Sequence, residues 1–152
     1  MKSDTPRYCF FVTSVVHPWD DTPYPCGVRS YYSPAQRAVQ TIRTIESIRL
    51  HCPEAKIVLC EGGAEYSEEI AQSVDKYIYA GKYHFIEKAV SGASKAWGEV
   101  WLTLFALPYL RHFDYVWKMS GRYCLTDKFN KGLWISGGGK NKITGLDIFG
   151  DN

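Results

Sequence analysis

A cluster of polar residues directly follows one of the most apolar segments of the chain. Tyr115 to Met119 is dense in aromatic and β-branched residues, which favours a buried, central β-strand. The sequence then changes at once to Ser120, Gly121, Arg122 and Tyr123. In open α/β sheets, ligands bind beyond the carboxyl ends of the strands. This position therefore predicts a ligand site, and the guanidinium of Arg122 suits a phosphate group.

A second cation, Lys118, lies within the same apolar segment. Burying an unpaired ammonium costs free energy, so this lysine is expected to face a cleft, where it and Arg122 could both contact a phosphate-bearing ligand. The alternatives are structural. Arg122 could pair with a carboxylate at the edge of the sheet, and Lys118 could extend from the strand end into water.

The segment before this strand predicts a helix over residues 95–110. Its apolar residues recur close to a period of 3.6 and are expected to form the buried face: Trp97, Trp101, Leu104, Phe105, Leu107 and Leu110. Lys95 and Glu99 lie one helical turn apart and so share a face. Pro108 is expected to kink the helix or to end it a turn early.

The first half of the chain predicts a buried strand over 8–16, a long loop over 17–32 and a helix that runs to about His51. Ser33 is expected to be the N-cap of this helix, with Pro34 at its first position and Gln36 completing a capping box. The helix is expected to expose Arg37, Gln40, Arg43, Ser47 and Arg49, and to bury its apolar face, which consists of Ala35, Ala38, Val39, Ile42, Ile45, Ile48 and Cys52.

The remaining segments complete an alternating order of strands and helices. Strands are predicted over 56–60 and 74–79, a short helix over 67–72, and a helical turn or loop over 83–90. This order predicts one α/β domain over residues 1–152, with a mainly parallel, Rossmann-like sheet and helices on both faces. Beyond Leu125 the pattern weakens to a turn, a short strand over 133–136 and a flexible glycine-rich stretch over 137–142.

Composition excludes several classes of function. The formal net charge of the 152-residue chain is +2, and there is no basic run, which argues against a nucleic-acid partner. The five cysteines are odd in number and show no CxxC spacing, so neither zinc ligation nor a disulfide framework is expected. Reduced thiols and a polar N-terminus without an apolar segment indicate a cytoplasmic protein, and no apolar run is long enough for a transmembrane span.

Two sets of patterns carry a family resemblance: FVTSVV, YYSPAQRAVQTIRTIESIR and AKIVLCEGG in the first half, and KAWGEVW with DYVWKMSGRYCL in the second. Together they resemble the nucleotide-binding half of GT-A glycosyltransferases, and more narrowly a set of little-characterised glycosyltransferase-like proteins. The resemblance covers roughly residues 8–129. It implies transfer of a sugar from a nucleotide-diphosphate sugar to a saccharide or other hydroxyl acceptor, as in polysaccharide biosynthesis.

The resemblance also implies roles for individual residues. Lys118 and Arg122 would be the catalytic cations. The nucleotide-sugar-binding residues would lie at the strand ends and at the start of the helix over 95–110, where backbone N–H groups favour an anion; they are Thr13, Ser14, Arg29, Glu61, Ser91, Gly92, Lys95, Glu99, Ser120, Gly121 and Tyr123. Glu61 would contact the base or ribose.

The chain departs from the GT-A pattern at the metal site. These enzymes commonly carry an Asp-x-Asp motif at the end of the fourth strand, where this sequence reads Lys118-Met119-Ser120-Gly121-Arg122. A cation can replace the metal opposite a leaving diphosphate, because the reaction requires positive charge at that position. We therefore expect no cofactor and no metal ligands. A need for Mn²⁺ and the oligomeric state stay open.

A second departure is length, because the acceptor half of such folds normally follows this strand. The chain could be a truncated product, a fragment or a minimal domain. Asp127 and Asp147 are the carboxylates that remain for a catalytic base, and Asp127 fits a turn better. The main alternative is therefore a non-catalytic nucleotide- or sugar-binding domain. A nucleotidyltransferase or methyltransferase is disfavoured because no glycine-rich turn follows the first strand.

Overall fold

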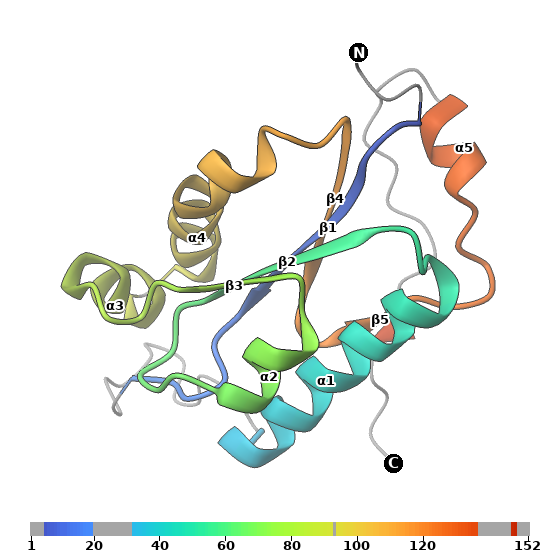
Figure 1. Ribbon diagram of the computed structural model, residues 1–152. Coiled ribbons are helices and arrows are strands. Elements are labelled where there is room, and N and C mark those ends of the chain that lie inside the picture. Colours follow the sequence, from blue (N-terminus) through green and yellow to red (C-terminus); the bar gives the residue numbers. More distant parts are fainter. Residues whose placement is uncertain (1–4, 20–31, 93, 137–146, 149–152) are drawn as a thin grey trace.

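The computed structural model describes residues 5–19, 32–92, 94–136 and 147–148. Four strands form one parallel sheet in the order β3-β2-β1-β4 (Figure 1). They are β1 (Tyr8–Ser14), β2 (Lys56–Glu61), β3 (Lys76–Tyr79) and β4 (Tyr115–Ser120). The predicted α/β, Rossmann-like class is confirmed.

Helices cover both faces of the sheet (Figure 1). One face carries α1 (Pro34–His51) and α2 (Glu68–Ser73), and the other carries α3 (His84–Ser91) and α4 (Lys95–Leu110). Successive side chains of β1 point to opposite faces. Phe10 therefore packs on the α1 side, while Phe11 packs on the α4 side. The two cores follow from this alternation in a strand that is buried along nearly all its length.

The start of α1 is as the sequence predicts. The Ser33 Oγ accepts a hydrogen bond from the Gln36 backbone N–H, and the Gln36 side chain accepts one from the Ser33 N–H. Pro34 occupies the first turn, where its missing N–H costs nothing. The predicted capping box is confirmed.

We expect Ser33→Ala to destabilise the protein by about 1 kcal/mol, because one N–H of the first turn loses its acceptor. Urea unfolding monitored by circular dichroism measures this change. Ser33→Asp is the matched control, since a carboxylate can still accept from the Gln36 N–H. A loss of stability in the Asp variant equal to that in the Ala variant would contradict the capping role.

The buried face of α1 differs from the predicted one. Ile45, Ile48 and Cys52 are buried as expected, but Ala35 is exposed and Val39 is 52% exposed. Arg37 and Gln40, predicted to face solvent, are buried instead. The first turns of α1 lie beside the ends of β1 and β4, where Arg37 donates to the Val15 carbonyl and Thr41 donates to the Gly121 carbonyl. A polar face is therefore buried there.

The prediction of a central β4 is wrong for the described sheet, where β4 is an edge strand. Its aromatic density reflects one face only, on which Trp117 packs against Phe10 and Phe129. On the other face Val116 is 41% exposed. Likewise, α4 buries Gly98, Leu102, Ala106 and Leu110, while Trp97, Leu104 and Leu107 of its predicted buried face are exposed.

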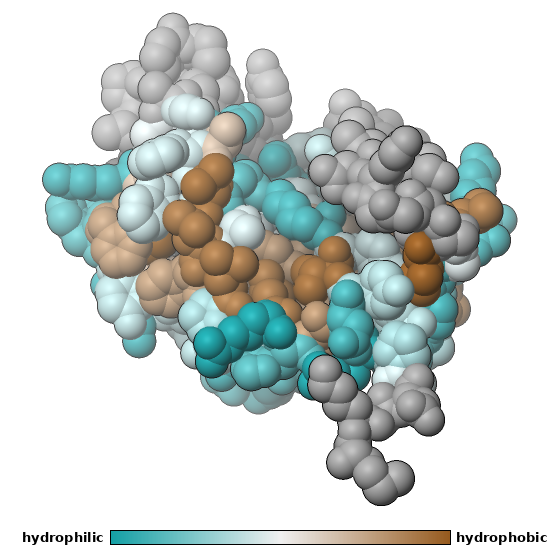
Figure 2. Space-filling model, turned by 90° about the horizontal axis from the view of Figure 1, so that it is seen from above, coloured by the Kyte–Doolittle hydropathy of each residue, from teal (hydrophilic) through white to brown (hydrophobic). Residues whose placement is uncertain are grey.

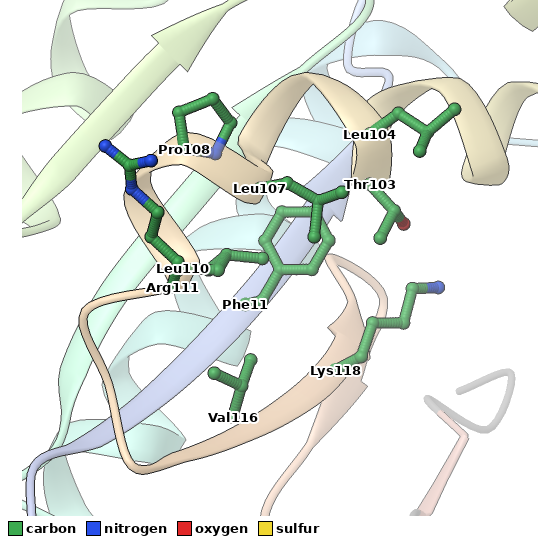
Figure 3. Close-up of a pocket in the computed structure, with 9 residues that line it drawn as sticks. All are labelled: Phe11, Thr103, Leu104, Leu107, Pro108, Leu110, Arg111, Val116 and Lys118. Atoms are coloured by element: carbon green, nitrogen blue, oxygen red, sulfur yellow. The ribbon is translucent and has the colours of Figure 1, made fainter.

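An apolar groove of about 730 Å³ results between α4 and β4. Leu104, Leu107 and Val116 line it, and the Lys118 side chain extends along its side (Figure 3). In the view from above, hydrophobic residues, coloured brown, form a patch across the middle of the visible face (Figure 2). Pro108 lies inside α4, which nevertheless continues to Leu110, so the predicted early end does not occur.

After β4, the short strand β5 (Tyr123–Cys124) pairs antiparallel with β6 (Asp147–Ile148). The strand predicted over 133–136 is wrong, because these residues belong to helix α5 (Lys131–Ser136). The predicted flexible stretch over 137–142 lies outside the described residues. None of the helices in the described part of the chain has the length and apolar character needed to cross a bilayer.

Candidate functional site

The strand order creates a crevice at the carboxyl ends of β1 and β4. From β1 the chain moves outward to β2 and β3, and it then returns to the opposite side of β1 as β4. The crossovers on the two sides of β1 lie on opposite faces of the sheet (Figure 1). Ligands of open α/β sheets bind at such a switch point. Two small cavities of about 70 and 100 Å³ lie here and share Val15, Arg37, Glu99 and Arg122.

The last two residues of β1 point to the two helices that flank this cleft. Thr13 Oγ1 donates to Oε2 of Glu99 on α4, at 2.8 Å. Ser14 Oγ lies 3.4 Å from Oγ1 of Thr41 on α1. The alternation that buries Phe10 and Phe11 on opposite faces thus directs two hydroxyls to opposite walls of the cleft.

The end of β4 forms the adjacent part of the cleft. The Gly121 N–H donates to the Thr13 carbonyl at 2.9 Å, and Thr41 Oγ1 donates to the Gly121 carbonyl at 3.2 Å. A Cβ on Gly121 would lie 3.0 Å from Thr41 Oγ1, so glycine permits this close approach. Ser120, Gly121 and Arg122, which the sequence predicts to contact a ligand, all line the smaller cavity.

Arg37, which the helical pattern predicts to face solvent, lines the cleft instead. Its guanidinium donates to the Val15 carbonyl at 2.5 Å and to the Tyr32 carbonyl at 3.4 Å. It thereby fixes the chain that leaves β1 against the first turn of α1. Arg37, Thr41, Thr44 and Ile48 recur at helical spacing, and this stripe was the signal that could have identified the face.

Lys118 on β4 and Glu99 on α4 form an ion pair beside the cleft, through Nζ and Oε2. Their side chains are 44% and 40% exposed. Lys118 lines the apolar groove and neither of the two cavities. Glu99 is therefore held by β1 through Thr13 and by β4 through Lys118. The charge of Lys118 is directed to this carboxylate, whereas Arg122 makes no hydrogen bond or ion pair within the described part of the chain.

Glu61 is 0% exposed, so its carboxylate does not line the cleft. Its Oε1 accepts hydrogen bonds from the N–H groups of Val16 at 3.0 Å and Gly63 at 2.6 Å. Burial raises the pKa of this carboxyl, and the nearby Ser14 hydroxyl and the two amides oppose the shift. In this structure Glu61 links the segments that follow β1 and β2, and direct contact with a base or ribose does not fit this position.

The remaining predicted residues divide between the cleft and other places. Lys95 opens α4 and lines the larger cavity with Gly98. Ser91 and Gly92 instead end α3, as its last residue and its C-cap. They therefore do not supply the amides of the α4 N-terminus. Tyr123 lies in β5 and packs against the α1-side core. Arg29 lies outside the described residues.

The described side chains that line the cleft offer charged groups and hydroxyl groups to a ligand. Burial raises the pKa of the Cys9 and Cys60 thiols to about 12, so neither supplies a thiolate nucleophile at neutral pH. Within the described ranges, no group of three His, Cys, Asp or Glu side chains is placed to hold a metal ion. The cleft combines arginine and lysine side chains with one carboxylate, a donor and acceptor set for a ligand with phosphate and hydroxyl groups.

Comparisons with protein-family models, curated protein sequences and solved structures find no match for this chain.

Proposed function

We propose that this chain is a glycosyltransferase that binds a nucleotide-diphosphate sugar in the cleft at the ends of β1 and β4. It would transfer the sugar to a saccharide or other hydroxyl acceptor. The observation that carries the proposal is the meeting of Thr13, Arg122 and Glu99 at the switch point of a parallel sheet. Groups that can donate hydrogen bonds to a phosphate lie there beside a carboxylate that can accept hydrogen bonds from hydroxyl groups. A sugar joined to a diphosphate requires both kinds of group.

Positive charge opposite the leaving diphosphate would come from Arg122, with Lys95 at the start of α4. Both residues line the larger cavity. Such preorganised charge stabilises a transition state in which negative charge develops on the leaving group. Lys118 pairs with Glu99, so it would hold the Glu99 carboxylate in place and would not contact the diphosphate directly.

Binding without transfer is the second candidate, and one observation favours it. Among the described residues that line the two cavities, Glu99 is the only carboxylate. A transferase commonly uses a carboxylate to deprotonate the acceptor. Here that carboxylate already accepts from Thr13 and Lys118.

A thermal-shift screen of the full chain against UDP, GDP, CDP and dTDP, with and without Mn²⁺, tests the proposal. A ligand that binds only the native state stabilises it by about 2.7 kcal/mol at 100 times its Kd, so the melting temperature must rise. We expect a rise with one nucleotide. Turnover of the matching nucleotide sugar with a saccharide acceptor then separates transfer from binding alone. No rise with any nucleotide, in folded protein, would overturn the proposal.

A further inference from the structure

Glu99 occupies an unusual position for a carboxylate in a site that would bind an anion. It lies in the second turn of α4 and lines both cavities together with Arg37 and Arg122. A negative charge at this point repels a diphosphate. The Lys118 ammonium offsets part of this charge, and the carboxylate gives the cleft an acceptor that suits a ligand with hydrogen-bond donors as well as phosphate oxygens.

The hydrogen bonds of Glu99 leave it able to accept such donors. Its bonds from Thr13 Oγ1 and Lys118 Nζ both end on Oε2. Within the described residues no donor is placed on Oε1. A carboxylate offers about four acceptor positions, so unused positions remain on a side chain that is 40% exposed.

Three elements fix the orientation of this carboxylate before any ligand binds. Glu99 projects from α4, and β1 and β4 hold it through Thr13 and Lys118. A group already held in place loses little side-chain entropy when a ligand arrives. A site built to hydrogen-bond a hydroxyl also discriminates strongly against ligands that lack it, because its acceptor is then left unpaired.

We infer that Glu99 accepts hydrogen bonds from ring hydroxyls of the sugar carried by the diphosphate, and so is a specificity-determining residue. This inference rests on the proposed function and deepens it. Arg122 would bind the diphosphate, while Glu99 would select the glycosyl group. The preferred ligand is then a nucleotide sugar rather than a free nucleotide or pyrophosphate.

The test compares two classes of probe by isothermal titration calorimetry on wild type and Glu99→Gln. The probes are inorganic pyrophosphate, which has no hydroxyl groups, and a panel of UDP-glucose, UDP-N-acetylglucosamine, GDP-mannose and dTDP-glucose. We expect the variant to bind the preferred nucleotide sugar about 10-fold or more weakly, because hydrogen bonds to a charged acceptor are the stronger ones. Pyrophosphate should bind equally well or more tightly, because a negative charge has been removed.

Glu87→Gln is the matched control, since it removes the same charge from α3, where Glu87 pairs with His84. It should leave both affinities unchanged. Should Glu99→Gln fail to fold, Glu99→Asp is the second variant, because it keeps the charge but shortens the side chain by one methylene. It should bind the nucleotide sugar more weakly and bind pyrophosphate as wild type does.

The outcomes separate this inference from the function on which it rests. If wild type binds a nucleotide sugar and Glu99→Gln binds it as tightly, the inference is overturned while the proposed function stands. If wild type binds none of the nucleotide sugars, both are overturned.

Discussion

Replacing Arg122 with alanine is expected to weaken binding of the nucleoside diphosphate by about 10- to 100-fold, the effect of losing charged hydrogen bonds of roughly 1.5–3 kcal/mol. Arg122 lines both cavities of the cleft. Its side chain makes no hydrogen bond or ion pair with the residues that the structure describes. Removal of the guanidinium should therefore leave the fold unchanged, and the melting temperature of the free protein should stay within a few degrees of wild type.

Calorimetry with the nucleotide identified in the thermal-shift screen measures the effect. Arg43→Ala is the matched control, because Arg43 lies exposed on α1 and its removal changes the net charge equally. Arg122→Lys should recover part of the affinity, since it restores the charge but not the two-pronged geometry of a guanidinium. Unchanged binding in a folded Arg122→Ala variant would exclude Arg122 from the site.

Local sequence signals were sufficient to predict the four strands of the parallel sheet and the helices α1, α2 and α4 in their order. The capping box at Ser33 and the continuous apolar run of β1 each depend on residues close together in sequence. The position of the cleft also followed, because parallel strands bring their carboxyl ends to one edge of the sheet. Thr13, Ser14, Ser120, Gly121 and Arg122 therefore meet where the sequence predicts.

Which face an element buries depends on partners that are distant in sequence, and here prediction failed. Arg37 can be buried because the Val15 carbonyl accepts a hydrogen bond from its guanidinium. The helical pattern of α1 alone does not reveal that acceptor, which belongs to another segment. The same holds for β4, whose apolar residues indicate burial although the described sheet ends at this strand. The Lys118–Glu99 ion pair likewise joins β4 and α4, and the sequence does not show how close these two elements lie in space.

The second large effect concerns Glu61, whose carboxylate is part of the architecture of the cleft. Glu61→Ala should lower the free energy of unfolding by roughly 2–4 kcal/mol, because the buried N–H groups of Val16 and Gly63 lose their acceptor. Urea unfolding at neutral pH measures the change. Glu46→Ala, which removes an exposed carboxylate from α1, should change stability by less than about 0.5 kcal/mol. A loss of that small size in Glu61→Ala would show that the two amides find other acceptors.

The pH dependence of stability provides an independent test of Glu61, with a definite sign. Burial raises the pKa of this carboxyl in the folded protein above its ordinary value of 4.5. The folded state thus holds the proton more tightly than the unfolded state. The corresponding contribution to stability is complete below pH 4.5 and is lost as the pH rises through the folded pKa.

Glu61→Gln isolates this contribution, because its amide cannot titrate and its Oε1 can still accept from Val16 and Gly63. The stability of wild type relative to Glu61→Gln should fall as the pH rises from 4.5, by at most about 1.4 kcal/mol per pH unit, until the pH passes the folded pKa. Urea unfolding of both proteins at several values between pH 4.5 and pH 8 gives this difference directly. A difference that grows in favour of wild type with rising pH would mean that the native carboxylate is stabilised in its charged form, with the two amides outweighing burial.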